Sequence, residues 1–173
     1  MFKAIKILLV DDSDDDVFLI KGLFEDAHLL NILYCVEDGE KAIKYLNQED
    51  EFKDSESPGL ILLDVNMPIK GGFEVLKEIK KIDLESLVII ITENEDIQPT
   101  IKALQNGASD YILKPCNKDE FVSRISRCLE KKMSKSQLRQ NDEKLVEMNE
   151  KLKTEISLRN DSEMELKINQ EKL

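Results

Sequence analysis

Histidine and cysteine are scarce in this chain of 173 residues, which has one histidine, His28, and three cysteines. With no second histidine or cysteine beside it, His28 is expected to be a surface residue at a helix end rather than a metal ligand or phosphoryl carrier. Cys35, Cys116 and Cys128 are odd in number and lack the spacing of a metal site. We therefore expect free thiols in a reducing compartment.

Basic residues and long apolar runs are also in short supply. The chain has 25 Lys and Arg against 36 Asp and Glu, a formal net charge of −11. Nucleic-acid binding depends on cations that neutralise phosphates, so this balance argues against a nucleic-acid partner. No segment reaches the roughly 18 consecutive apolar residues of a membrane span. Met1 to Ala4 lead into an apolar run without the pattern of a signal peptide, so we expect a cytoplasmic protein with no membrane partner.

Hydrophobic residues make up 41% of the chain, which is sufficient for one core. They are arranged in two patterns that alternate along the sequence. Between short apolar runs lie segments of helical period, such as Val17, Ile20 and Leu23. This alternation predicts a flavodoxin-like (βα)5 domain, a doubly wound parallel sheet of order 2-1-3-4-5, over about residues 1–130. The acid-rich stretch 47–58 is expected to be a solvated loop. The predicted strands are residues 5–10, 32–36, 60–63, 87–91 and 111–113.

Carboxylates stand at the ends of two predicted strands. Asp11 and Asp12 follow the run 5–10, and Asp64 follows the run 60–63. The predicted order makes these strands neighbours, so the three acids would meet at the carboxyl edge of the sheet. Clustered like charges require raised pKa values or a divalent cation, and oxygen ligands without histidine or cysteine favour Mg²⁺. The alternative is that the acids only cap the helices that follow.

A hydroxyl and an ammonium group stand at the ends of two further predicted strands. Thr92 follows the run 87–91, and Lys114 follows the run 111–113. Pro115 disfavours helical geometry at the residue before it, so Lys114 is expected in a turn with its side chain able to reach the acids. Either residue alone would be unremarkable, but polar groups at four strand ends predict one site.

Sequence motifs surround these strand ends. They are Val10-Asp11-Asp12, Leu63-Asp64-Val65-Asn66-Met67-Pro68 with Gly71-Gly72, Ile91-Thr92, Asn106-Gly107-Ala108-Ser109-Asp110-Tyr111, and Lys114-Pro115. Together they resemble the receiver domain of two-component response regulators, over about residues 4–130. The resemblance implies that Asp64 accepts a phosphoryl group from the phosphohistidine of a sensor histidine kinase or a phosphotransfer protein. It also implies Mg²⁺ bound by Asp12, Asp64 and the backbone carbonyl of Asn66, with Asp11 holding a metal-bound water.

The resemblance assigns a switch as well. Lys114 would contact the acyl phosphate, the hydroxyl of Thr92 would turn inward to hydrogen-bond it, and Tyr111 would change rotamer in response. The aspartyl phosphate would hydrolyse spontaneously, at a rate that Asn66 and Asn94 influence. The chain would then be a signalling module and not an enzyme.

Two features complicate this resemblance. The family usually has a small residue after the switch threonine, whereas here Glu93 follows Thr92. Its carboxylate would either hinder small phosphodonors or point to solvent. Asp14, Asp15 and Asp16 follow the metal pair, and we expect them to begin the first helix, where negative charge favours the helix dipole. Contact with the water shell of the metal is the alternative.

Glycine and proline are absent between Asn117 and Leu173, so the last helix of the domain is predicted to continue without a stop. Apolar residues recur in it at spacings of seven, three, four and four, namely Leu138, Leu145, Met148, Leu152 and Ile156. This pattern predicts a coiled-coil homodimer over residues 131–173, with Asn141 interrupting the heptads and a stutter before Ile156. The alternative is a charged, solvated helix that is disordered alone.

The helical pattern continues to Leu173, and the stretch Thr154-Glu155-Ile156-Ser157-Leu158-Arg159 resembles helices that precede sensory, kinase or cyclic-dinucleotide domains. We therefore expect an output domain that is absent from this chain. Two other functions stay open. One is a degenerate receiver that acts only as an interaction and dimerisation module, which Glu93 would favour. The other is a phosphatase of the haloacid dehalogenase type, although that class needs a second acid two residues after its nucleophile, where this chain has Asn66.

Overall fold

The computed structural model describes most of the chain, which forms two compact units, Met1–Glu130 and Lys131–Leu173. His28 and Asn94 lie outside the described residues, as does the N-terminal stretch from Met1 to Ala4. The described residues are 6–27, 32–68, 71–93 and 97–170.

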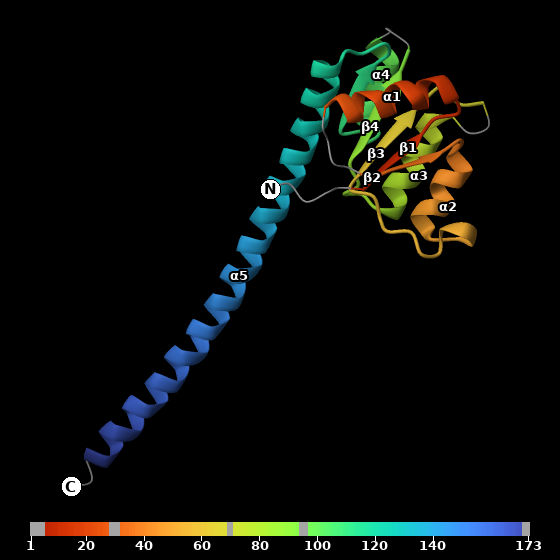
Figure 1. Ribbon diagram of the computed structural model, residues 1–173. Helices are drawn as coiled ribbons and strands as arrows, with labels where there is room; N and C mark the ends of the chain where they lie inside the picture. Colours follow the sequence, from red (N-terminus) through yellow and green to blue (C-terminus); the bar gives the residue numbers. More distant parts are fainter. Residues whose placement is uncertain (1–5, 28–31, 69–70, 94–96, 171–173) are drawn as a thin grey trace. The chain divides into compact units, whose positions relative to one another are not determined.

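The first unit alternates strands and helices, as predicted. The strands are β1 (Lys6–Val10), β2 (Ile32–Val36), β3 (Leu60–Asp64), β4 (Val88–Thr92) and β5 (Asp110–Leu113). The helices are α1 (Asp14–Asp26), α2 (Gly39–Asn47), the short 3-10 helix η1 (Asp50–Phe52), α3 (Gly72–Ile82), α4 (Ile97–Gln105) and α5 (Lys118–Gln170). All strand pairs are parallel and the order is β2-β1-β3-β4-β5, which confirms the flavodoxin-like doubly wound sheet followed by a long C-terminal helix (Figure 1).

Continuous apolar runs form the centre of the sheet. Every residue of β3 and β4 is buried, because each strand is paired on both sides and covered on both faces. In β2, at the edge of the sheet, only Val36 is fully buried. The two central strands therefore carry their last residues, Asp64 and Thr92, into a buried position.

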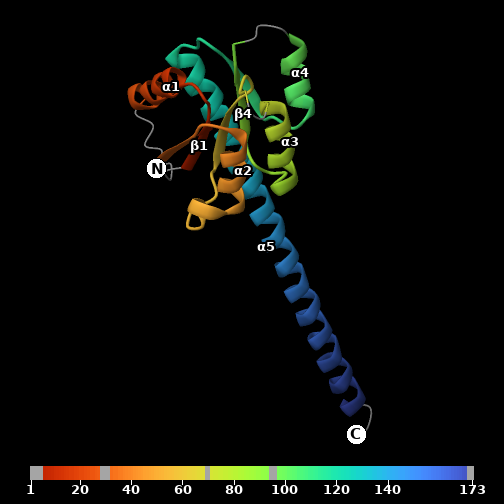
Figure 2. The same ribbon diagram turned by 90° about the vertical axis from the view of Figure 1, so that its right-hand side faces the viewer.

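Helices cover both faces of the sheet (Figure 2). The core on one face takes its side chains from α2, α3 and α4, among them Tyr45 and Leu76. The core on the other face takes Phe24 from α1 and Phe121 from the start of α5, whose rings meet edge to face with centroids 5.0 Å apart. This second face is the one that positions α1 beside the β5–α5 connection.

The acid-rich stretch 47–58 is largely exposed, as predicted, but one of its residues, Phe52, is buried. It contains η1, in which Phe52 is only 4% exposed. The ring of Phe52 packs against Tyr45 of α2 and Tyr34 of β2, with centroids 5.4 and 6.1 Å away. The sequence did not predict the burial of Phe52, because it depends on aromatic residues of distant elements.

In the second unit α5 remains helical, and apolar side chains along it are exposed. Among the described residues, no helix combines the length and the apolar character that a membrane crossing requires. Among the residues of the second unit whose side chains are described, the exposed large apolar ones are Met133, Leu138, Leu145, Val146, Met148, Leu152, Ile156 and Leu158.

Candidate functional site

Three carboxylates meet at the carboxyl edge of the sheet. Strands β1 and β3 pair with Val10 opposite Leu63, so the next residues along each strand, Asp11 and Asp64, are neighbours. Both are buried, at 3% exposure, whereas Asp12 is exposed. Carboxylate oxygens from the three residues lie within 4.8 Å of one another. The strand ends thus bring together the acids that the sequence places there.

Local hydrogen bonds orient the two buried carboxylates. Asp11 Oδ1 accepts from the backbone N–H of Ser13 at 3.0 Å, and Asp64 Oδ2 accepts from the backbone N–H of Asn66 at 2.9 Å. Each bond spans two residues and holds the carboxylate against its own turn. The remaining carboxylate oxygens form an oxygen-only donor set, which fits a hard divalent cation such as Mg²⁺.

Lys114 brings a positive charge to these acids from the end of β5. Its side chain is only 13% exposed, and its Nζ lies 2.9 Å from Asp11 Oδ2 and 3.3 Å from Asp64 Oδ1. The backbone N–H of Lys114 donates to Thr92 O at 2.7 Å, and the peptide bond to Pro115 is cis. The turn therefore directs the lysine side chain back over the sheet edge, as the sequence suggests.

Burial and charge act in opposite directions on these groups. Burial alone would lower the pKa of Lys114, but hydrogen bonds to Asp16 and Asp11 and the charge of Asp64 raise it above its ordinary value. Burial raises the pKa of the Asp64 carboxyl; Lys114 opposes this rise and Asp11 adds to it. Lys114 is therefore a permanent cation. Burial and the charge of Asp11 make the ionised form of Asp64 unfavourable, and a bound cation would reduce this free-energy cost.

Asp16 makes a contact with Lys114 that the sequence did not predict. It lies in the first turn of α1, which begins after the N-cap Ser13, and its carboxylate receives the shortest bond from Lys114, 2.7 Å from Nζ to Oδ2. Asp14 and Asp15 are exposed and, as predicted, occupy the first turn of the helix. Asp16 differs from Asp14 and Asp15 only because the packing of α1 against the β5–α5 connection brings its carboxylate to Lys114.

Thr92 and Tyr111 lie on adjacent strands. Thr92 ends β4 and is 3% exposed, and Asp64 is paired with the residue before it, Ile91. Tyr111 is half-buried in β5, and the guanidinium of Arg124 from α5 lies 4.8 Å from its ring centroid. The aromatic residue named as part of the switch is thus in direct contact with α5, a contact that the sequence did not predict.

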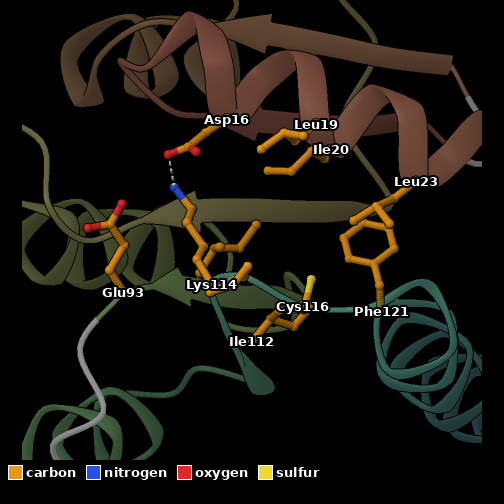
Figure 3. Close-up of a pocket in the computed structure, with 11 residues that line it drawn as sticks. Asp16, Leu19, Ile20, Leu23, Glu93, Ile112, Lys114, Cys116 and Phe121 are labelled. Atoms are coloured by element: carbon orange, nitrogen blue, oxygen red, sulfur yellow. Dashed lines mark hydrogen bonds and ion pairs between the residues drawn. The ribbon is translucent and has the colours of Figure 1, made fainter.

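A cavity of about 460 Å³ opens between α1 and the β5–α5 connection, next to the carboxylates (Figure 3). Its walls are largely apolar, and its polar end is formed by the Asp16–Lys114 pair and by Glu93. Glu93 is exposed at this end. Leu19, Ile20, Leu23, Ile91, Ile112, Pro115, Cys116 and Phe121 complete the lining.

Gly72, the first residue of α3, holds the backbone close to the acceptor strand. A Cβ at this position would overlap the carbonyl oxygen of Asp64 and lie 2.6 Å from Val65 Cα. Because both are backbone atoms, they cannot move aside without displacing the end of β3.

We expect Gly72→Ala to lower the free energy of unfolding by about 1–3 kcal/mol, the typical cost of overpacking a well-packed site. Gly71→Ala is the matched control, because a Cβ at Gly71 meets no atom within 4 Å of the described residues. Urea denaturation of both variants measures the difference. Equal stability of the two variants would contradict the close approach at Gly72.

The fold and the site together define a class of protein. The family described as "Response regulator receiver domain" matches residues 7–126, which is more than half of the chain. The chain therefore belongs to this family. Receiver domains are signalling modules of two-component systems, and they interact with histidine kinases or phosphotransfer proteins. They bind Mg²⁺ at an acidic pocket, which Asp11, Asp12 and Asp64 form here. This membership favours a receiver over a phosphatase of the haloacid dehalogenase type.

Named relatives agree with this family. The chain is 36% identical over 118 residues to the response regulator Rcp1 of Synechocystis, covering 66% of this chain and 80% of that protein. It is 33% identical over 141 residues to the probable C4-dicarboxylate response regulator DctR of Bacillus subtilis, covering 81% of this chain and 58% of DctR. The solved structure of the phosphorylated cyanobacterial phytochrome response regulator RcpA is 29% identical with a TM-score of 0.62, over 74% of this chain and 91% of that one.

Proposed function

We propose that residues 1–130 are a phosphorylatable receiver domain in which Asp64 accepts a phosphoryl group from a histidine kinase or phosphotransfer protein. We also propose that residues 131–173 form a dimeric coiled coil that transmits the state of this domain. The observation that carries the proposal is the convergence of Asp11, Asp12, Asp64 and Lys114 at one sheet edge.

Asp64 has the properties of an acceptor. In the transfer, the P–N bond of the donor phosphohistidine breaks and a P–O bond to a carboxylate oxygen of Asp64 forms. The donor imidazole leaves with the electron pair of the broken bond, as a neutral base when its second nitrogen carries a proton. The product is a mixed anhydride, which water hydrolyses. Such a transfer depends mainly on position and charge stabilisation, and Lys114 supplies a fixed cation 3.3 Å from Asp64 Oδ1.

Asp11, Asp12 and Asp64 would hold Mg²⁺ together with the backbone carbonyl of Asn66, with Asp11 acting through a water molecule. When bound, the metal would neutralise negative charge on the acceptor and on the transferred oxygens. The oxygen-only donor set supports this assignment. A crystal structure of the relative Rcp1 in a Mn²⁺-bound form, 30% identical with a TM-score of 0.61 over 73% of this chain and 90% of that one, also supports it.

The proposed switch runs from Thr92 to Tyr111. The hydroxyl of Thr92 would turn toward the acyl phosphate, and the Tyr111 ring would follow it inward. Arg124 lies over that ring, on the helix that continues beyond residue 130. The same guanidinium donates to Asp110 Oδ1 at 3.1 Å. A change of the Tyr111 rotamer would therefore alter the surroundings of a charged group on α5.

The proposed dimer follows from the exposed apolar residues of the second unit. Leu138, Leu145 and Leu152 are spaced by seven residues and are 62%, 58% and 48% exposed. A helix with a leucine repeat of this kind buries it against a partner helix, and a second copy of the chain carries the matching repeat.

Labelling by a small phosphodonor such as acetyl phosphate tests the proposed function. In Mg²⁺ the chain is expected to gain the mass of one phosphoryl group and to lose it by self-hydrolysis once the donor is removed. EDTA should prevent labelling, and intact-protein mass spectrometry follows both steps. A phosphorylated form that persists for days in Mg²⁺ would contradict self-hydrolysis.

Glu93→Ala is the companion variant for this test, because Glu93 is exposed at the polar end of the cavity. If the variant is labelled and the wild type is not, Glu93 restricts small donors and the acceptor is competent. If neither chain is labelled by a small donor or by a phosphorylated histidine-containing protein, the degenerate receiver is the better description.

A further inference from the structure

We propose that Asp16 is an electrostatic latch on Lys114: it holds the lysine in the unphosphorylated state and competes with the phosphoryl group for its ammonium. This inference rests on the proposed function, because it concerns the lysine that would contact the phosphoryl group on Asp64. Asp16 acts through Lys114 and is a positioning residue.

The geometry of the pair supports a latch. The Nζ of Lys114 lies 2.7 Å from Asp16 Oδ2, closer than to Asp11 or Asp64. The Lys114 side chain is 13% exposed and the Asp16 side chain 23% exposed, so water screens the charge pair only partly. Figure 3 shows the Asp16 carboxylate pointing from α1 directly toward the lysine ammonium.

The helix N-terminus fixes Asp16 in this position. Ser13 is the N-cap of α1, and its side-chain oxygen accepts from the backbone N–H of Asp16 at 3.3 Å. On the same helix, Ile20 and Phe24 are buried in the core against Phe121 and other residues. The carboxylate is therefore carried by a packed helix and does not depend on a mobile loop.

A count of hydrogen bonds gives the reason for competition. An ammonium group has three N–H donors, and Lys114 uses them on Asp16, Asp11 and Asp64. A divalent cation would compete for Asp11 and Asp64, which belong to the carboxylate cluster, but not for Asp16, which does not. With metal bound, Asp16 is then the principal anionic partner of the lysine. A phosphoryl oxygen on Asp64 must draw the ammonium away from it.

This latch has two consequences. It raises the free energy of the phosphorylated state relative to a chain without Asp16, because part of the charge of Lys114 is already neutralised. It also shortens the lifetime of the phosphorylated state, because the ammonium is shared with a second acceptor. Asp16 therefore sets the balance between the two signalling states without touching the reacting atoms.

Beryllofluoride, a mimic of the acyl phosphate, tests the latch in the full chain with saturating Mg²⁺. Asp16→Asn is expected to bind beryllofluoride about five- to tenfold more tightly than the wild type, the scale of one charge-assisted hydrogen bond shared between two acceptors. Asp15→Asn is the matched control, one residue away in the same helical turn and exposed, and it should stay within about twofold.

A titration with Mg²⁺ alone separates the latch from a gain in metal affinity. Without beryllofluoride, Asp16→Asn should bind Mg²⁺ no more tightly than the wild type, because a nearby negative charge has been lost, so tighter beryllofluoride binding cannot come from the metal. General loosening of α1 would instead weaken the binding of both ligands. Equal beryllofluoride affinity in Asp16→Asn and Asp15→Asn, or weaker binding in Asp16→Asn, would overturn the latch. If the wild type and Asp64→Asn respond identically to beryllofluoride, the proposed function itself fails, which is a distinguishable result.

Discussion

Asp64→Asn is expected to abolish phosphoryl transfer to this chain, with labelling by a small phosphodonor at least about a hundredfold lower than in the wild type. An amide has nearly the shape of the carboxylate but is not the nucleophile that forms a mixed anhydride. It also removes one of the three carboxylates that converge within 4.8 Å, so Mg²⁺ binding should weaken as well. Mass spectrometry of intact protein and calorimetric titration with Mg²⁺ measure the two effects.

The same variant tests the pKa of Asp64 through the pH dependence of stability. Burial raises the pKa of Asp64, so the native chain takes up a proton at a higher pH than the unfolded chain. In metal-free buffer, the free energy of unfolding of the wild type relative to Asp64→Asn should therefore be larger at pH values below this raised pKa. The difference should be lost as the pH rises through it toward neutral pH. Asp54→Asn changes an exposed acid outside the cluster and should label normally. Persistent labelling of Asp64→Asn would assign the acceptor to another residue.

Loss of the dimer is the other large expected effect. The double variant Leu145→Asp with Leu152→Asp should weaken self-association by at least about a hundredfold, because it places four like charges along one apolar seam of the dimer. Sedimentation measurements over a range of concentrations would then find a monomer. The receiver core lies in a separate compact unit, so its thermal unfolding should be unchanged.

Val146→Asp is the matched control for the seam. Val146 is 60% exposed, nearly the same as Leu145 at 58%, but it does not share the spacing of seven with Leu138 and Leu152. Val146→Asp should weaken self-association much less than the double variant does. Equal disruption by Val146→Asp would reject the predicted seam, and a wild type that is monomeric at all concentrations would favour a solvated helix. Repeating the measurement with beryllofluoride and Mg²⁺ reveals whether the acceptor site and the dimer are coupled.

The strands could be predicted because they depend on short-range patterns, and their order could be predicted because topology rules for alternating strands and helices leave few arrangements open. Buried parallel strands are continuous apolar runs, and the predicted runs agree with the observed strands to within one residue at each end. The positions of Asp11, Asp64 and Thr92 follow from the same patterns, since each comes at the end of such a run. The long helix α5 could be predicted from the absence of glycine and proline after Asn117.

Other contacts could not be predicted, because they join residues far apart in the sequence. Asp16 and Asp15 have the same chemistry and adjacent positions, yet only Asp16 reaches Lys114, 98 residues away. Phe52 lies in a run of acids and is nevertheless buried against Tyr34 and Tyr45. Arg124 resembles the other charged residues of α5, but it lies over the ring of Tyr111.

The sequence by itself determined the class of fold and the residues that end each strand, because periodicity and strand-end chemistry are local properties. Its motifs also carried the resemblance to the receiver family. The tertiary structure decided how those residues are charged and paired. Burial of Asp64 and the three carboxylates around Lys114 depend on the packing of α1, β3 and β5, and no window of the sequence contains all of them.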